Sequence, residues 1–191
     1  IVKKLKANID AGIKEFSSAP ENFEHNIFKT QQIDTFLGRQ KSLKKITSYL
    51  DNETNTPLII YSRSGMGKTT LMKKAIEEAE EATLGKARIF YKFVGADGKS
   101  FYKRDLLTDL ICEIEGSSQK DNLNNLSEYD FDKYVSELLS SDKDENIVIF
   151  IDALDQLKAT DQLFWLPQKL GKNVKIILSV LKDEEFRAVS Y

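Results

Sequence analysis

One eight-residue stretch, Ser62–Thr69, constrains the fold of this chain more than any other part of its sequence. It reads Ser-Arg-Ser-Gly-Met-Gly-Lys-Thr, follows the apolar run 57–61 and precedes a helical pattern of apolar residues. The order of strand, glycine-rich loop and helix is typical of a phosphate-binding P-loop. Glycines let the loop turn its N–H groups toward an anion, and the start of the helix adds unpaired N–H groups and partial positive charge. The stretch therefore predicts a phosphate site.

Single residues of this loop have predicted roles. Lys68 supplies a cation for the β- and γ-phosphates, and the Thr69 hydroxyl can coordinate Mg²⁺. Ser62 stands where the usual pattern has its first glycine; serine adopts left-handed φ less freely, but we expect binding to survive this departure. Arg63 can contact phosphate or a neighbouring subunit, or it can be an exposed loop residue. The residues expected to contact nucleotide here are Ser62, Arg63, Ser64, Gly65, Met66, Gly67, Lys68, Thr69 and Thr70.

A second apolar run, at 146–152, ends in a carboxylate. It reads Asn-Ile-Val-Ile-Phe-Ile-Asp, and a strand that is apolar on both faces belongs in the middle of a parallel sheet. Ligands of such sheets bind at the carboxyl ends of the strands, so we expect Asp152 to hold the Mg²⁺ water shell opposite Thr69. Asp155 follows three residues later. It can orient or deprotonate an attacking water, or it can cap the next helix.

Several stretches around these two motifs carry a family resemblance. They are Thr-Phe-Leu-Gly-Arg-Gln-Lys-Ser-Leu at 35–43, Phe-Val-Gly-Ala at 93–96, Asp-Ala-Leu-Asp-Gln-Leu at 152–157, Leu-Pro at 166–167 and Val-Lys-Ile-Ile-Leu-Ser at 174–179. Together with the P-loop they resemble the STAND class of P-loop NTPases, and within it the NACHT-like branch that carries repeat-type sensor domains. The resemblance covers about residues 33–181.

The resemblance implies a fold. It is an α/β P-loop NTPase three-layer sandwich with a parallel sheet, of the kind shared with AAA+ proteins. The strand at 174–179, called sensor-1 in the family, would lie between the P-loop strand and the strand at 146–152. Four core strands are visible, and the family's fifth strand and winged-helix region have no counterpart. We therefore expect the fold to be truncated after the sensor-1 strand.

The resemblance also implies site residues. Ser179 would sense the γ-phosphate, and the catalytic set would be Lys68, Asp152, Asp155 and Ser179. Thr69 and Asp152 would be the metal-binding pair. In the family, the residues around the Gly-Arg pair of the stretch at 35–43, here called the Gly-Arg box, line the adenine pocket. The matching positions here are Leu37, Gly38 and Arg39.

STAND proteins are multidomain switches, and this too is carried over as an implication. ADP holds such a protein closed, and exchange for ATP permits oligomerisation and activates an effector in signalling or antiviral defence. The cofactors would be ATP or ADP with Mg²⁺, hydrolysis would be slow, and the module would self-associate. Residues 1–32 would be a helix and linker to an effector domain, and 33–191 the NTPase domain. The chain begins without Met, so we expect it to be part of a longer protein with its own effector and sensor domains.

Composition narrows the classes of partner. The formal net charge is −2 and the pI is about 5.6, which argues against a general electrostatic attraction to nucleic acid. No apolar run is long enough to span a bilayer and no signal peptide opens the chain, so we expect no membrane partner. Cys112 is the only cysteine, which rules out a disulfide within the chain and favours the cytoplasm.

Other classes remain alternatives. The Gly-Arg box is shared with AAA+ and initiator-type ATPases that act on DNA, and a scaffold that binds ATP without hydrolysing it is also open. A small-molecule kinase should add arginines around a second substrate, and none can be assigned. A GTPase should carry an Asn-Lys-x-Asp motif, which the sequence lacks.

Overall fold

A parallel sheet forms the centre of the molecule. The computed structural model describes residue 29 and residues 38–96, 102–116, 120–158 and 163–181. Its strands are β1 (Leu58–Ser62), β2 (Ala87–Phe93), β3 (Asn146–Asp152) and β4 (Val174–Leu181). They pair in the order β1-β4-β3-β2, and every neighbouring pair is parallel. The predicted parallel α/β fold is confirmed, and the strand at 174–181 lies between the P-loop strand and β3, as expected.

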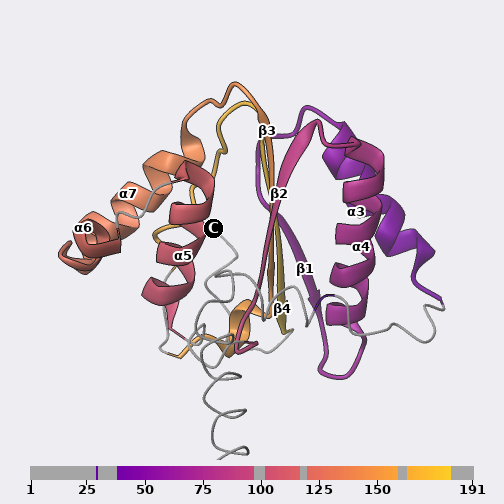
Figure 1. Ribbon diagram of the computed structural model, residues 1–191. Coiled ribbons are helices and arrows are strands. Elements are labelled where there is room, and N and C mark those ends of the chain that lie inside the picture. Colours follow the sequence, from indigo (N-terminus) through magenta and orange to yellow (C-terminus); the bar gives the residue numbers. More distant parts are fainter. Residues whose placement is uncertain (1–28, 30–37, 97–101, 117–119, 159–162, 182–191) are drawn as a thin grey trace, which may run out of the picture.

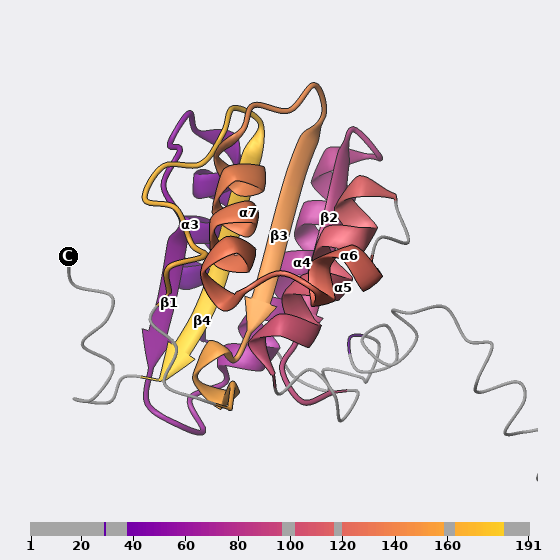
Figure 2. The same ribbon diagram turned by 90° about the vertical axis from the view of Figure 1, so that its left-hand side faces the viewer.

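Helices cover both faces of the sheet and complete three layers (Figure 1). On one face lie α3 (Gln40–Asp51) and α4 (Lys68–Thr83). On the other lie α5 (Lys103–Glu115), α6 (Lys120–Asn124) and α7 (Glu128–Ser140) (Figure 2). Two hydrophobic cores result, one under each helix layer. The six apolar and acidic residues that follow Asn146 in β3 are all buried, because this strand lies inside the sheet with helices on both sides.

Local sequence signals explain several element boundaries. The Ser127 hydroxyl accepts a hydrogen bond from the Asp130 N–H at 3.1 Å and so caps α7. Gly116 ends α5 at a φ of 64°, which glycine adopts without strain. Cys112 and Trp165 are buried packing residues.

Two segments differ from what their composition predicts. The polar stretch 116–126, which reads as a loop, contains the short helix α6, because Leu123 is buried and its carbonyl accepts a hydrogen bond from Arg104 at 2.9 Å. The apolar residues 164–166 read as a short helix but form turns, since Pro167 disfavours helical backbone just before it. Between β3 and β4 the described chain has only the 3₁₀ turn η1 (Leu154–Gln156).

Some expectations fall outside the described residues. They concern the helix and linker over 1–32 apart from Lys29, and the adenine-pocket candidate Leu37. Within the part of the chain that the structure describes, no helix is both long and apolar enough to cross a membrane.

Gly171, just before β4, packs directly against the backbone that follows α7. A Cβ at this position would lie 2.0 Å from the carbonyl oxygen of Ser141, and the clash is with backbone. Gly171→Ala should therefore lower the free energy of unfolding, measured in denaturant, by about 3 kcal/mol. Gly85 is the matched control: its φ is +78° and a Cβ there meets nothing within 4 Å. Gly85→Ala should cost only the backbone strain, about 1 kcal/mol; equal losses would contradict the clash.

Candidate functional site

The loop between β1 and α4 turns at two glycines. Gly65 has a φ of 71° and Gly67 a φ of 74°, both left-handed. A Cβ on either would meet no atom within 4 Å, so glycine is required for its backbone conformation and not for space. Gly67 is the N-cap of α4 and has no side chain to occupy the N–H groups of the first helical turn. These groups form the kind of helix start that binds anions.

Ser62 sits in extended backbone. It is the last residue of β1 and pairs with Leu181 of β4. The left-handed conformation that would penalise serine is therefore not required at this position. The departure from the usual glycine carries no backbone strain.

Lys68 reaches back across the loop. Its side chain is almost buried, and its ammonium group donates a hydrogen bond to the carbonyl of Ser62 at 3.1 Å. Arg63 is exposed. The other loop residues divide by exposure: Ser64, Gly65, Met66 and Gly67 are exposed, while Thr69 and Thr70 are half-buried.

Three elements bring Thr69, Asp152 and Ser179 together beside Lys68. Asp152 ends β3 and is 4% exposed. It accepts a hydrogen bond from the hydroxyl of Ser179, which is fully buried in β4, and is also hydrogen-bonded to the Thr69 side chain at the start of α4. The carboxyl ends of β3 and β4 and the start of α4 therefore meet at one point.

The surroundings of Asp152 have opposing effects on its pKa. Burial raises the pKa of Asp152, and the nearby Asp155 carboxylate raises it further. The hydrogen bonds from Ser179 and Thr69 and the positive charge of Lys68 lower it. Because burial is the largest cause, the net pKa shift is upward, and a cation placed here would be favoured by the carboxylate it helps to ionise.

The residues present fit a hydrated Mg²⁺. Mg²⁺ prefers hard oxygen ligands and is usually held by one or two carboxylates together with substrate phosphates. The Thr69 hydroxyl and the Asp152 carboxylate, already hydrogen-bonded to each other, are such oxygens. Over the described residues, no group of three or more His, Cys, Asp and Glu side chains could hold a metal alone.

Asp155 lies in η1 and does not cap it. The N-cap of this turn is Ala153, and the Asp155 carboxylate instead accepts a hydrogen bond from the backbone N–H of Leu181 at 2.7 Å. The suggestion that Asp155 caps the following helix is therefore wrong. Its carboxylate ties η1 to the end of β4, close enough to Asp152 to raise the pKa of that group.

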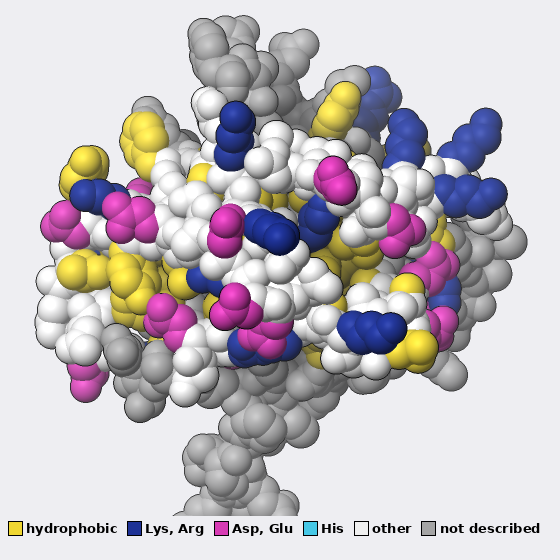
Figure 3. Space-filling model, turned by 90° about the horizontal axis from the view of Figure 1, so that it is seen from above, with side chains coloured by type: hydrophobic (Ala, Val, Ile, Leu, Met, Phe, Trp, Pro, Cys, Tyr) yellow, Lys and Arg dark blue, Asp and Glu magenta, His cyan; other side chains and the backbone are white. Residues whose placement is uncertain are grey.

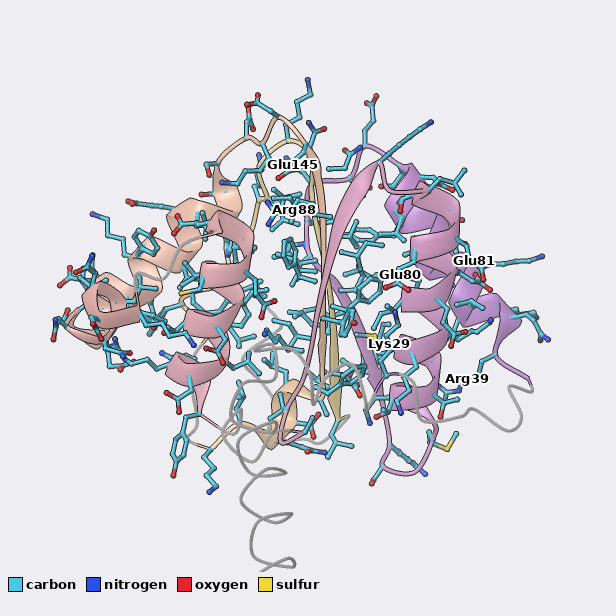
Figure 4. The ribbon with its side chains drawn as sticks, in the orientation of Figure 1. Lys29, Arg39, Glu80, Glu81, Arg88 and Glu145 are labelled. Atoms are coloured by element: carbon cyan, nitrogen blue, oxygen red, sulfur yellow. The ribbon has the colours of Figure 1, made fainter. Side chains whose placement is uncertain are left out.

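Gly38 and Arg39 lead into α3. Gly38 has a φ of 86°, and Arg39 is the N-cap of the helix, where its carbonyl accepts from the N–H groups of Ser42 and Leu43 at 3.0 Å. Figure 4 shows Arg39 at the end of the molecule where α4 begins.

Sequence reasoning missed one residue near the site. Lys73 lies on α4, is 7% exposed, and feels the charge of Asp152. Burial lowers its pKa and Asp152 raises it, with burial the larger cause. The available signal was a lysine within the apolar pattern of α4, between Met72 and Ala75.

A cavity of about 770 Å³ lies at the amino ends of the strands, at the end of the sheet opposite the P-loop. It is lined by the ends of α3 and α4 and by the starts of β2, β3 and β4, so it is separate from the P-loop. Figure 3 looks onto this end and shows hydrophobic surface among scattered Lys, Arg, Asp and Glu side chains. The mixture of charges selects no ligand.

Comparisons with known proteins point to the same kind of module. Residues 36–186 match a family described as an ATPase domain predominantly from Archaea. The chain is 25% identical over 179 residues to mouse NACHT domain- and WD repeat-containing protein 1, covering 86% of this chain and 11% of that protein. It is 31% identical over 145 residues to human NACHT and WD repeat domain-containing protein 2, covering 67% of this chain and 8% of that protein. The chain thus spans only about a tenth of the length of these relatives.

Proposed function

Because the chain belongs to the family of ATPase domains found predominantly in Archaea and is a NACHT-like P-loop NTPase module, we propose that it binds ATP or ADP with Mg²⁺ and hydrolyses ATP slowly. One observation carries the proposal. Thr69, Asp152 and Ser179 are joined by hydrogen bonds beside the Lys68 charge, at the mouth of a glycine loop. The groups proposed to bind phosphate, to bind Mg²⁺ and to supply a carboxylate therefore lie side by side, as phosphoryl transfer requires.

Each residue has a proposed part. Lys68 and the N–H groups from the P-loop hold the phosphates, with Ser62 to Thr70 in contact. Thr69 and Asp152 hold Mg²⁺, which when bound neutralises charge on the phosphates. Ser179 orients Asp152 and reads the γ-phosphate, and Asp155 positions the attacking water. The proposed adenine contacts are Leu37, Gly38 and Arg39.

We further propose that the module, residues 33–191, is part of a STAND-type switch. Residues 1–32 would connect it to an effector domain, and self-association would accompany activation in signalling or defence in the cytoplasm. The support is the resemblance of the motifs and the names of two relatives, which combine a NACHT domain with WD repeats. Repeats of that kind would be the sensor in the whole protein.

One observation favours a second candidate, a scaffold that binds ATP without hydrolysing it. Asp155 already has a structural partner in the N–H of Leu181. A carboxylate that serves to fasten η1 to β4 needs no catalytic role. The ATPase acting on DNA has no such support in the described residues.

Magnesium dependence of phosphate release tests the proposal. Wild-type protein should release phosphate from ATP with Mg²⁺ and not with EDTA. Thr69→Ala should raise the Mg²⁺ concentration needed for half-maximal release by about tenfold or more, because one metal ligand is lost. Thr83→Ala, at the other end of α4, is the control and should leave that concentration within about twofold.

Two results would contradict these assignments. An equal shift in the Thr69 and Thr83 variants would remove Thr69 from the metal site. ATP binding without any phosphate release would leave the scaffold as the function.

A further inference from the structure

Lys73 is a nearly buried lysine one turn along α4 from the proposed metal ligand Thr69. Its side chain is 7% exposed, and the neighbouring Met72 is fully buried. Residues four apart on an α-helix lie on the same face, so Lys73 and Thr69 face the same way. The Thr69 side chain is hydrogen-bonded to Asp152, which ends β3. Lys73 therefore belongs to the face of α4 that is turned toward this carboxylate.

The direction of α4 brings the Lys73 ammonium toward the phosphate loop. Side chains on a helix lean toward its N-terminus. The N-terminus of α4 follows the P-loop and lies at the same end of the molecule as the carboxyl ends of the strands (Figure 1). The charge of Asp152 raises the pKa of Lys73, in agreement with this direction, and Lys68 has the larger effect on the carboxylate. Asp152 therefore lies within the fields of two cations.

The charges of the site balance before any ligand arrives. Lys68 and Lys73 carry the positive charge, and Asp152 and Asp155 carry the negative charge. A cation beside metal ligands repels Mg²⁺ and attracts phosphate, because the metal and the phosphate have opposite charges. When Mg²⁺ arrives together with nucleotide, the negative charge of the phosphates offsets this repulsion. The second lysine therefore acts in opposite directions on the two ligands of the site.

We propose that Lys73 makes the uptake of Mg²⁺ depend on nucleotide. In the empty site its ammonium serves as a counter-ion of Asp152 and disfavours a divalent metal there. When nucleotide binds, the same charge favours the phosphates, so nucleotide and metal enter together. The inference rests on the proposed function, in which Thr69 and Asp152 hold the metal. It adds the order in which that site is filled and the residue that sets this order.

Two binding constants, both measured without hydrolysis, test this role. Mn²⁺, which takes the same oxygen ligands as Mg²⁺, is titrated into protein that has been stripped of nucleotide with EDTA and dialysed, and electron paramagnetic resonance gives the free Mn²⁺. ADP is titrated separately in EDTA by calorimetry. Lys73→Met removes the charge and keeps a long side chain, so it should bind Mn²⁺ about tenfold more tightly and ADP about tenfold more weakly. A purely structural role of Lys73 would weaken both.

Further variants serve as controls. Lys73→Arg keeps the charge and should leave both constants within about threefold of wild type. Lys74→Met removes the next charge along the chain, where Lys74 pairs at the surface with Glu77, and should leave both within about twofold. Asp152→Asn, added to Lys73→Met, should abolish the tighter Mn²⁺ binding, since the metal is then without its carboxylate. If thermal unfolding shows that Lys73→Met does not fold, Lys73→Gln replaces it with the same expected shifts.

The possible results separate this role from its alternatives. Opposite shifts of the two constants in Lys73→Met, absent from Lys74→Met, would support it. Unchanged constants, weaker binding of both ligands, or tighter Mn²⁺ binding that survives Asp152→Asn would overturn it and leave the proposed NTPase function intact. Failure of that function gives another result: wild-type protein would bind neither Mg-ATP nor ADP, and this would overturn both proposals.

Discussion

Replacing Lys68 by alanine is expected to weaken the binding of Mg-ATP and Mg-ADP by about 100-fold, or about 2.7 kcal/mol. The Lys68 ammonium is nearly buried and held across the loop by the carbonyl of Ser62, so it is positioned over the helix start before any phosphate arrives. A charge-assisted hydrogen bond to phosphate contributes about 1.5–3 kcal/mol. The loop N–H groups remain in the variant, which is why some binding should persist.

Two measurements check this expectation. Wild-type protein, denatured after purification, should release ADP or ATP that chromatography identifies, and Lys68→Ala should release none. Calorimetric titration with Mg-ATP then gives the loss of affinity. Lys74→Ala is the matched control, because Lys74 lies on the same helix but pairs at the surface with Glu77 at 3.0 Å.

The contrary outcomes are informative. Equal nucleotide content in wild type and the Lys68 variant would place the bound nucleotide elsewhere. A wild-type protein that is empty and also fails to bind added Mg-ATP would make the module a structural one, or one that needs regions beyond residues 1–191.

Where sequence predicted the fold well, the cause was burial on both sides. The run 146–152 is apolar from 147 to 151 and forms β3 with the same bounds, because both faces of the strand are covered by helices. The loop 62–69 is equally well predicted, since its two glycines adopt the left-handed backbone that the turn requires. The meeting of Lys68, Asp152 and Ser179 followed from the expected strand order, which placed three strand ends side by side.

What sequence could not predict depends on contacts between distant residues. The helix α6 exists because Leu123 is buried and held by Arg104, which polar composition does not reveal. Lys73 joins the site only because α4 turns that side chain toward the buried carboxylate. The anchoring of Asp155 to Leu181 joins residues 26 apart and has no local signal.

Because Asp155 also accepts the Leu181 N–H, two different substitutions of Asp155 can separate its catalytic role from its structural role. Asp155→Asn should lower the turnover number for ATP by about 10²–10³-fold, because an amide cannot take a proton from water. Binding of Mg-ATP should stay within about twofold. The asparagine keeps a carbonyl oxygen that can accept the Leu181 N–H at the position of the carboxylate, so η1 and β4 should remain joined.

Asp155→Ala separates catalysis from anchoring. It removes both the proton acceptor and the partner of Leu181, so it should lose turnover to the same extent and also lower the melting temperature, by about 2–4 °C for roughly 1 kcal/mol. Steady-state phosphate release and thermal unfolding of both variants provide the comparison. If Asp155→Asn keeps full turnover while Asp155→Ala only melts earlier, the carboxylate is a fastener between η1 and β4, and the water must be positioned by another group. If both variants lose turnover but only Asp155→Ala melts earlier, the same carboxylate serves both purposes, and the link through Leu181 ties the catalytic base to the strand that carries Ser179.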